Sequence, residues 1–270
     1  MRIFTVDSFT DTPFRGNPAA VCVLEQAFTD KEYIDIAQEM NLSETAFVYL
    51  ENGAYQLKWF TPINEVDLCG HATLATAKIL FEKYPLDSDT INFTTRSGVL
   101  SVSKAGNRLE MNFPIGKLTV FEGRDKILEA FLNEKPLSVN TDKDWCIIEL
   151  ENEALVANFK PDLNVLLSHD KKAFVITAKS ESEDYDFVSR FFGPAIGIDE
   201  DPVTGSAHCY LAKYWSEKLS KNKLTGYQAS KRGGYVECEC LDDDRVLLRG
   251  DCVIMSEVLM EWRNHVTINV

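Results

Sequence analysis

The sequence predicts a mixed α+β protein built from two pseudo-symmetric lobes. Many short runs are rich in Val, Ile, Phe, Tyr and Thr and are bounded by turn residues, which is typical of strands. Only a few longer segments have a helical pattern. The chain also repeats an ordered set of motifs, and its 270 residues, 45% of them hydrophobic, suffice for one large domain or two smaller ones.

The expected strands are short and occur along the whole chain. Branched and aromatic residues dominate them, and such residues suit a pleated, half-buried surface. The expected strands cover residues 1–9, 20–25, 45–50, 55–61, 90–95, 98–103, 109–113, 145–150, 173–178, 235–240, 245–249 and 252–259. Many strands with few helices indicate an α+β arrangement.

Helices are expected over residues 30–40, 71–83 and 206–219. The first places Tyr33 and Ile36 on one face, at the spacing of an amphipathic helix. The other two are longer, rich in Ala and Leu, and each follows a glycine.

The internal repeat keeps its order along the chain. The matched segments are 46–48 with 173–175, 58–62 with 190–194, and 69–72 with 204–207. The offsets grow smoothly, from 173 − 46 = 127 through 190 − 58 = 132 to 204 − 69 = 135. This order predicts two duplicated lobes, each with a strand, an aromatic strand and a glycine-led helix; chance similarity among common patterns is the alternative.

Two such lobes would present two helix N-termini to one cleft. Each N-terminus offers unpaired backbone N–H groups and the positive end of a helix dipole, so together they would bind an anion. Gly70 and Gly205, at the two helix starts, let a ligand approach the backbone closely.

The charge of the chain limits its partners. The formal net charge is −14 and the pI is about 4.8, a field that repels nucleic acid and anionic membranes. We therefore expect neither as a partner. A carboxylate substrate would also be repelled, so an anion site must be built from short-range groups.

A cytoplasmic location is expected. Asp7 interrupts the N-terminal apolar run too early for a signal core, and no apolar run approaches the ~20 residues that span a bilayer. The seven cysteines are an odd number, and most lie within strand-like or helix-like runs. Buried, reduced thiols explain this better than a disulfide framework.

Glu44 is the best candidate for a catalytic acid/base. It lies between Leu42 and Phe47, whose apolar side chains allow the partial burial that raises the pKa of a carboxyl group. A solvated carboxylate at a strand entrance is the alternative. The matching place in the second repeat is taken by Lys171, which indicates that the lobes share a scaffold but not a role.

Two further segments carry polar groups at the predicted helix starts. His71 lies in the first turn of its helix, where the dipole disfavours imidazolium; plain hydrogen bonding is its alternative role. Residues 200–206 combine two acids, Pro, Gly and two hydroxyls. Either this is capping and turn chemistry, or Asp201 is held beside the helix start and Ser206 binds the ligand.

Cys69 precedes the first glycine-led helix, where a thiol pKa is lowered and the sulfur could act as a base or nucleophile. The matching residue of the second repeat is Thr204, so a two-thiol racemase lacks its second sulfur. We interpret Cys69 as a packing residue. Dinucleotide, phosphate-loop and nucleophile-elbow motifs are absent from the sequence, and its Cys and His spacing does not suit zinc, so neither a cofactor nor a metal is expected.

Four ordered motifs cover nearly the whole chain. They are residues 6–10 with 14–21, residues 42–47, residues 69–73 and residues 197–207. In these motifs the sequence resembles the phenazine biosynthesis PhzF-like family, which has the diaminopimelate epimerase-like fold.

The resemblance implies that each lobe is a curved, mostly antiparallel sheet wrapped around a central helix, with the active site in the cleft between the lobes. We expect residues 1–114 to form the N-terminal lobe and residues 115–255 the C-terminal lobe. Residues 256–270 are expected to return to the first lobe. Members of the family are commonly homodimers, so a homodimer is expected.

The resemblance also implies roles for single residues. Glu44 would be the proton-shuttling acid/base, with His71 and Asp201 as its catalytic partners. The implied substrate-binding residues are Asn17, Ser43, Gly70, Thr73, Thr204, Gly205 and Ser206.

These observations predict a cofactor-independent isomerase that moves a proton on a small carboxylate substrate. The type member of the family isomerises a dihydro-hydroxyanthranilate, whereas related epimerases invert an α-carbon with two cysteines. Thr204 departs from the two-cysteine pattern, which favours the Glu-based branch. A non-catalytic binding module of the same fold and a racemase that depends on Cys69 are the alternatives.

Overall fold

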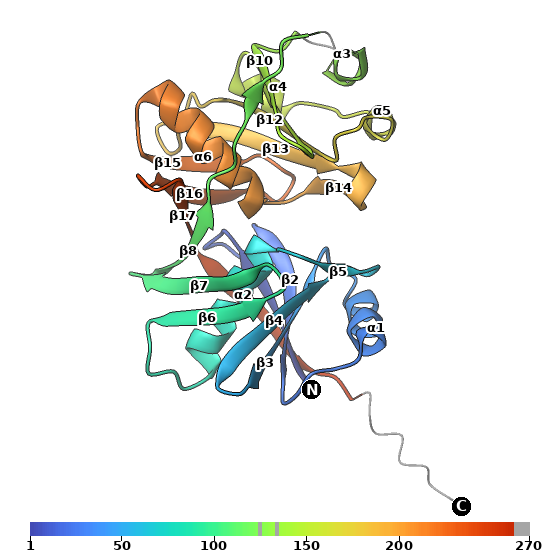
Figure 1. Cartoon of the computed structure of the whole chain (residues 1–270), viewed down its shortest axis with the longest axis vertical. Helices are drawn as coiled ribbons and strands as arrows, with labels where there is room; N and C mark the ends of the chain where they lie inside the picture. The colour runs from blue at the N-terminus through green and yellow to red at the C-terminus, as the bar shows by residue number, and fades with distance from the viewer. Residues whose placement is uncertain (124–125, 133–134, 262–270) are drawn as a thin grey trace, which may run out of the picture.

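The protein has the expected α+β fold. The computed structural model describes residues 1–123, 126–132 and 135–261. Figure 1 shows an elongated molecule with one body of strands and helices above another, joined through strands near its middle. The strands of both bodies belong to one hydrogen-bonded sheet.

The first half of the chain wraps a curved sheet around helix α2 (Gly70–Lys83). Its strands are β1 (Arg2–Ser8), β2 (Asn17–Leu24), β3 (Thr45–Glu51), β4 (Ala54–Phe60), β5 (Glu65–Val66), β6 (Thr90–Thr95), β7 (Gly98–Ala105) and β8 (Arg108–Pro114). Neighbours pair antiparallel, except that β2 pairs with β3, and β4 with β6, in parallel. Helix α1 (Asp30–Met40) packs its apolar side on this sheet and begins at a capping box formed by Thr29 and Glu32.

The second half repeats this arrangement around helix α6 (Gly205–Leu219). Its strands are β10 (Ser138–Thr141), β11 (Trp145–Glu149), β12 (Ala173–Lys179), β13 (Phe187–Gly193), β14 (Ile198–Asp201), β15 (Lys223–Gln228), β16 (Gly234–Cys240) and β17 (Arg245–Gly250). The order and direction of pairing match the first half strand for strand, with parallel pairs β11–β12 and β13–β15. This agreement supports the internal repeat seen in the sequence.

Each half also lends a strand to the other. After β8 the chain continues into β9 (Thr119–Val120), which pairs with β10 of the second half. After β17 it continues into β18 (Cys252–Leu259), which pairs with β1 of the first half. Strands β8 and β17 pair with each other where the halves meet. Of the segment 256–270 expected to return to the first lobe, residues 262–270 lie outside the described residues.

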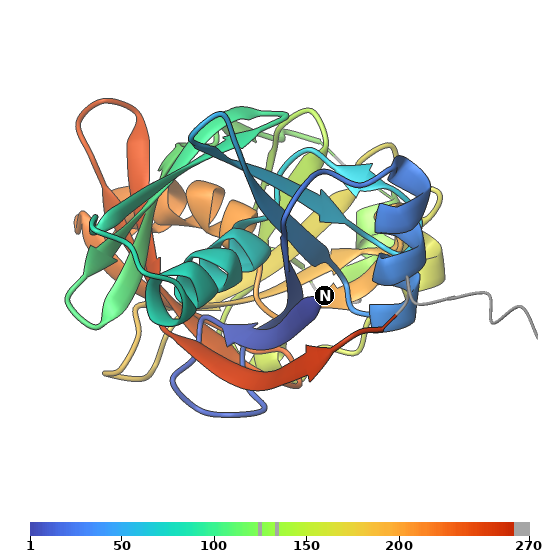
Figure 2. The same ribbon diagram turned by 90° about the horizontal axis from the view of Figure 1, so that it is seen from below.

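The two central helices form the core of the molecule. Small and apolar residues cover α2 on nearly every side, and most of them are buried, as expected for a helix enclosed by a sheet. Figure 2 shows α2 running inside the surrounding strands. Helix α6 is enclosed in the same way, and one hydrophobic cluster contains residues of both helices.

Some elements were not expected from the sequence. They include β15, whose interior glycine weakens the strand pattern, and the short helices α3 (Lys126–Leu132), α4 (Glu153–Ala157) and α5 (Leu163–Leu166). The short helices pack a second hydrophobic cluster against β11–β13. None of the helices in the described part of the chain is both long and apolar enough to cross a bilayer.

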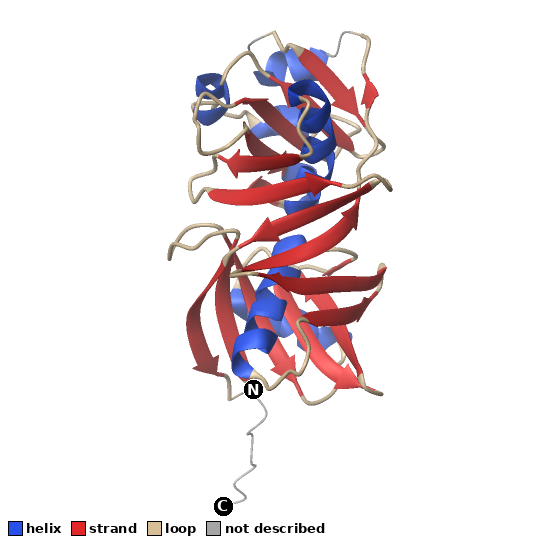
Figure 3. Ribbon diagram, turned by 90° about the vertical axis from the view of Figure 1, so that its left-hand side faces the viewer, coloured by secondary structure: helices blue, strands red, loops and turns tan. Residues whose placement is uncertain are grey.

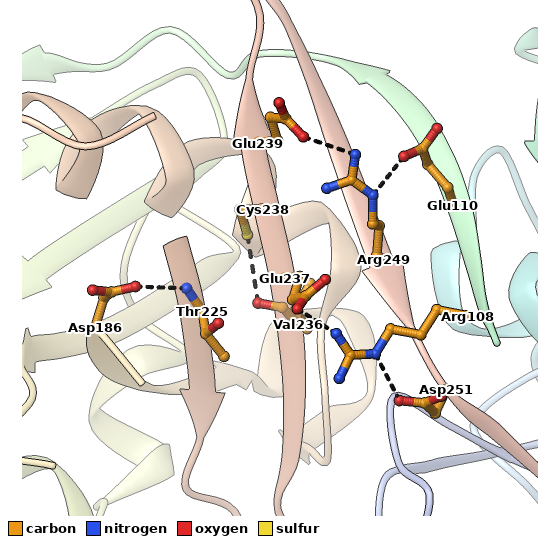
Figure 4. Close-up of polar contacts among 10 residues, drawn as sticks. All are labelled: Arg108, Glu110, Asp186, Thr225, Val236, Glu237, Cys238, Glu239, Arg249 and Asp251. Carbon is orange, nitrogen blue, oxygen red and sulfur yellow. Dashed lines mark hydrogen bonds and ion pairs between the residues drawn. The ribbon is translucent and has the colours of Figure 1, made fainter. Parts of the chain in front are cut away.

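A ladder of charged side chains lies across β8, β17 and β16, at the junction of the two halves (Figure 4). Arg249 of β17 donates to Glu110 of β8 at 2.5 Å and to Glu239 of β16 at 2.8 Å. Arg108 of β8 pairs in the same way with Glu237 and Asp251. Each arginine thus joins carboxylates from different segments of the junction.

Candidate active site

The two central helices begin opposite each other. A methyl group added to Gly70 would lie 3.7 Å from the Cα atom of Gly205, and the reverse distance is also 3.7 Å. Figure 3 shows the helices of the two halves following one another inside the strands. The backbone N–H groups of both first turns have no partner within their helices, so their partial positive charges meet at one place.

A cleft of about 680 Å³ opens at this junction. Its wall includes three groups that the sequence singled out as catalytic, together with both helix starts. The predicted site residues that line it are Glu44, Gly70, His71, Asp201, Thr204, Gly205 and Ser206. The halves contribute to one site because the helix starts face each other.

Glu44 and His71 form the centre of the site. Glu44 directly precedes β3, and His71 is the second residue of α2. Their exposed fractions are only 8% and 5%, and Oε2 of Glu44 lies 3.4 Å from Nε2 of His71. Neither atom has a well-aligned hydrogen bond with any described residue. Such a contact can tighten when a substrate binds.

Burial sets the protonation of this pair. It raises the pKa of the Glu44 carboxyl, while the Ser43 hydroxyl opposes the shift. Burial lowers the pKa of His71, and the charge of Asp201 opposes that shift. His71 is therefore neutral at neutral pH, and Glu44 is a stronger base than an exposed carboxylate.

Asp201 is held by groups from both halves of the chain. Nδ2 of Asn17, the first residue of β2, donates to Oδ1 of Asp201 at 2.7 Å and to the Val203 carbonyl at 2.9 Å. The Thr204 hydroxyl donates to Oδ2 of Asp201 at 2.5 Å. Burial raises the pKa of Asp201 to about 6; the charge of His71 and these hydrogen bonds oppose the shift, whereas Glu44 adds to it.

Gln228 is a supporting residue that sequence reasoning missed. It is fully buried at the end of β15. Its Oε1 accepts from the Thr204 N–H at 2.9 Å, and its Nε2 donates to the Asp201 carbonyl at 2.7 Å. A glutamine at a strand end carries no sequence signal of such a role, which depends on burial.

The remaining predicted residues have different positions. Thr73 is buried, its hydroxyl donates to the Cys69 carbonyl at 2.6 Å, and it does not line the cleft. Ser43 is half-buried beside Glu44 but is also not part of the cleft wall. Asn17 does not line the cleft either, but its side-chain amide contacts Asp201 and His71, which do.

The strand register corrects the proposed counterpart of Glu44. Ala46 pairs with Trp59 in the first half, and Val175 pairs with Phe191 in the second. Trp59 and Phe191 are equivalent in the repeat, so their partners Ala46 and Val175 are equivalent too. Glu44, two residues before Ala46, therefore corresponds to Ala173, not to Lys171. The match between the two short Ala-Phe-Val segments placed the alignment two residues away from the register of the strands. A shift of two residues along a strand leaves each side chain on the same face.

Apolar side chains from both halves form much of the remaining cleft wall. None of them was predicted as a site residue, because hydrophobic residues are expected in any strand or loop beside a core. They are Ile63, Val66, Leu68, Trp145, Phe191, Ile196 and Ile198.

Cys69 lies in the same wall. Its Sγ is 3.5 Å from Nδ1 of His71, and one ligand atom each from Glu44, Cys69 and His71 lie within 4.8 Å of one another. Burial raises the pKa of the thiol well above its usual range, Glu44 adds to the shift, and the Ala72 N–H opposes it. Metal binding at this group would release the thiol proton.

Comparisons with known proteins agree with this fold. The family described as phenazine biosynthesis-like protein matches residues 6–258. A protein of Halalkalibacterium halodurans named an uncharacterized isomerase is 46% identical over 96% of this chain and 98% of its own. The crystal structure of a phenazine biosynthesis PhzF family protein from Enterococcus faecalis is 40% identical, with a TM-score of 0.90 over 95% of this chain and 97% of that chain.

A more distant likeness concerns the fold alone. The structure of a hydroxyproline epimerase from Agrobacterium vitis has a TM-score of 0.60 at 7% identity, over 96% of this chain and 91% of that one.

Proposed function

This chain is an isomerase that belongs to the phenazine biosynthesis-like family, and we propose that it moves a proton on a small carboxylate substrate with Glu44 as the acid/base. One observation carries the proposal. The Glu44 carboxyl is buried in the wall of the cleft, with Oε2 lacking an aligned partner among the described residues, beside the meeting point of two helix N-termini.

The helix starts supply the anion site. The substrate carboxylate would accept hydrogen bonds from the first-turn N–H groups of α2 and α6, which begin at Gly70 and Gly205. These fixed donors overcome the repulsion from the net charge of −14 at short range. Ser206, half-buried in the cleft wall, adds a hydroxyl.

The reaction needs one proton acceptor and a place for the electron pair. Glu44 takes the proton from a carbon next to the carboxylate or conjugated with it, and the electron pair of the broken C–H bond moves into the conjugated system. The backbone N–H groups stabilise the negative charge that develops there. Glu44 then returns the proton to the same carbon or to another one, so no cofactor is consumed.

The asymmetry of the two halves supports a single base. Ala173, with only a methyl group, stands where the first half has Glu44. Thr204 stands where the first half has Cys69. The second half therefore offers neither a second carboxylate nor a second thiol at these places.

Substitution of Glu44 by Gln tests the proposal. General acid/base transfer contributes about 10²–10⁴-fold, so Glu44→Gln should slow the reaction by roughly that factor while the protein remains folded. The measurement is deuterium incorporation from D₂O into a panel of small carboxylates, followed by NMR. Glu51→Gln, an exposed change at the other end of β3, is the matched control and should exchange like the wild type.

The outcomes separate the alternatives. Incorporation that persists in Glu44→Gln would contradict the role of Glu44. Binding of a carboxylate without any exchange in the wild type would favour a binding module instead. Loss of exchange on alkylation of Cys69, with Glu44→Gln active, would favour the thiol-dependent racemase.

A further inference from the structure

We infer that Asn17 and Cys69 hold His71 in the tautomer that carries its hydrogen on Nε2, so that His71 donates to Glu44 and does not accept the substrate proton. The inference deepens the proposed function and rests on it for its catalytic meaning. It assigns Cys69 as a positioning residue rather than a base.

The direction of the hydrogen bonds can be followed from Gln228. Its Oε1 faces the Thr204 N–H, a donor, so the orientation of its amide is fixed. Its Nε2 must then donate to the Thr204 hydroxyl, at 3.1 Å. Because that hydroxyl oxygen accepts from Gln228, its own hydrogen points to Asp201, at 2.5 Å.

The orientation of Asn17 follows from its acceptors. Nδ2 lies 2.7 Å from Oδ1 of Asp201 and 2.9 Å from the Val203 carbonyl, and neither of these oxygens has a hydrogen to give while Asp201 is ionised. The amide nitrogen, with its two hydrogens, therefore occupies this position. It also lies 3.3 Å from Nδ1 of His71. A hydrogen on Nδ1 would face the N–H groups of Asn17.

Cys69 supplies a donor to the same nitrogen, because both hydrogens of the Asn17 amide point to Asp201 and the Val203 carbonyl. Its Sγ is 3.5 Å from Nδ1 of His71, and the thiol is buried. Burial keeps the thiol protonated, because its pKa is raised well above the usual range. The S–H group can then donate to the Nδ1 lone pair, whereas a thiolate would require a hydrogen on Nδ1.

The consequence appears on the other side of the ring. With Nδ1 as an acceptor, the neutral imidazole carries its hydrogen on Nε2, which faces Oε2 of Glu44 at 3.4 Å. The two atoms are not aligned for a hydrogen bond in the structure; when the contact tightens on substrate binding, this N–H stabilises ionised Glu44, the form that takes a proton from the substrate. Since Nε2 already holds a hydrogen, the proton on Glu44 has no route into His71 and returns to the substrate.

Nitrogen NMR of the full-length chain, labelled with ¹⁵N-histidine, tests the tautomer directly and needs no substrate. Two-bond ¹H–¹⁵N correlations distinguish an N–H nitrogen from a bare one, and His71→Gln identifies the His71 signals by their loss. At neutral pH we expect His71 to be neutral with hydrogen on Nε2. A hydrogen on Nδ1, or an imidazolium, would overturn the inference.

Variants of Cys69 test its part. Cys69→Ala removes the donor, so the Nδ1 signal should move toward that of a nitrogen without a hydrogen bond, whereas Cys69→Ser keeps a donor and should stay near the wild type. Cys209→Ala, a buried thiol of α6 that contacts the Gly205 carbonyl, is the control. An Nδ1 signal unchanged in Cys69→Ala would remove Cys69 from the inference.

Turnover separates this inference from the proposed function. If Glu44-dependent exchange is found, Cys69→Ala should slow that exchange by about tenfold, an effect typical of the loss of one hydrogen bond in a charged network. Cys69→Ser should keep most of the wild-type exchange rate. Complete loss in both variants would show that Cys69 is a base. Failure of the Glu44 test with the predicted tautomer intact would reject the reaction but keep the assignment of His71.

Discussion

The carboxyl of Asp201 is buried between groups from both halves of the chain, in the wall of the cleft. Asn17 and Thr204 donate to its two oxygens, and His71 and Glu44 lie close enough to shift its pKa. Desolvation outweighs the donors, so the pKa of Asp201 is raised from its usual 3.8 to about 6. The folded protein therefore binds this proton more tightly than the unfolded chain does.

This raised pKa predicts a pH dependence of stability. Between pH about 4 and about 6, Asp201 is protonated more often in the native state than in the unfolded chain. Its contribution to the free energy of unfolding is therefore favourable at the acid end and is lost as the pH rises toward 6. The loss is at most about 3 kcal/mol. Asp201→Asn should remove this pH-dependent loss. The difference in unfolding free energy between wild type and variant should therefore change across this pH range.

Urea unfolding at several pH values measures that difference. Asp199→Asn, in the same strand β14 but exposed, is the control and should follow the wild type. A difference between wild type and Asp201→Asn that is constant from pH 4 to pH 7 would show that the pKa of Asp201 is not raised.

At the level of elements, packing does not explain why helix α2 begins with a glycine. A methyl group at Gly70 would make only ordinary contacts, 3.7 Å from Gly205 and 4.0 Å from Met111, and the backbone there does not need a positive φ. Gly70 is thus replaceable as far as the fold is concerned. The side chain it lacks would point toward the junction where the carboxylate is proposed to bind.

Gly70→Ala should therefore separate stability from binding. Stability should stay the same or rise by about 0.4–1 kcal/mol, because alanine restricts the unfolded chain. The added methyl should weaken carboxylate binding, with KM raised about tenfold or more. Thermal unfolding and steady-state kinetics measure the two effects, and unchanged KM would argue against a carboxylate at the helix starts.

A matched glycine provides the contrast. Gly226 lies in β15, and a methyl there would come within 2.5 Å of Phe187 and 2.9 Å of His208. Gly226→Ala should lower stability by about 1–3 kcal/mol through overpacking.

On the scale of the whole molecule, the repeat made much of the architecture predictable. The two glycine-led helices and most strands lie where their patterns placed them, and the offset between Gly70 and Gly205 identified the helices that meet. The sequence pattern carries this information because an amphipathic element such as α1 buries one face, whereas the enclosed helix α2 is apolar on nearly every side. The local motifs also marked Glu44, His71 and Asp201 as candidates, and the structure places all three in one cleft.

What the sequence could not predict depends on long-range register and burial. The counterpart of Glu44 was misassigned because a three-residue match cannot fix strand pairing, which the partners of Trp59 and Phe191 determine. Gln228 and the apolar wall of the cleft carry no local signal. The role of Gln228 depends on its burial beside Thr204 and Asp201, 24 and 27 residues away, and the wall forms only when segments of both halves are brought together.

The exchange of strands between the halves leads to a last prediction, that the molecule unfolds as one unit. Strand β8 pairs with β17, and β9 and β18 each pair with a strand of the opposite half, so neither half keeps a complete sheet alone. Urea unfolding should show one transition, and native-state hydrogen exchange should give α2 and α6 the same free energy of global opening. Two separate opening free energies would contradict this coupling.

The charged ladder at the junction contributes to that single transition. Arg249→Met removes the partner of Glu110 and Glu239 together, both largely covered from solvent, so the unfolding free energy should fall by about 1 kcal/mol or slightly more. Lys31→Met breaks an exposed pair with Asp35 on α1 and should cost less than about 0.5 kcal/mol. Because β17 belongs to the sheet around both helices, the Arg249 variant should lower the opening free energies of α2 and α6 equally. A decrease confined to one helix would mean that the ladder stabilises only the half that contains that helix.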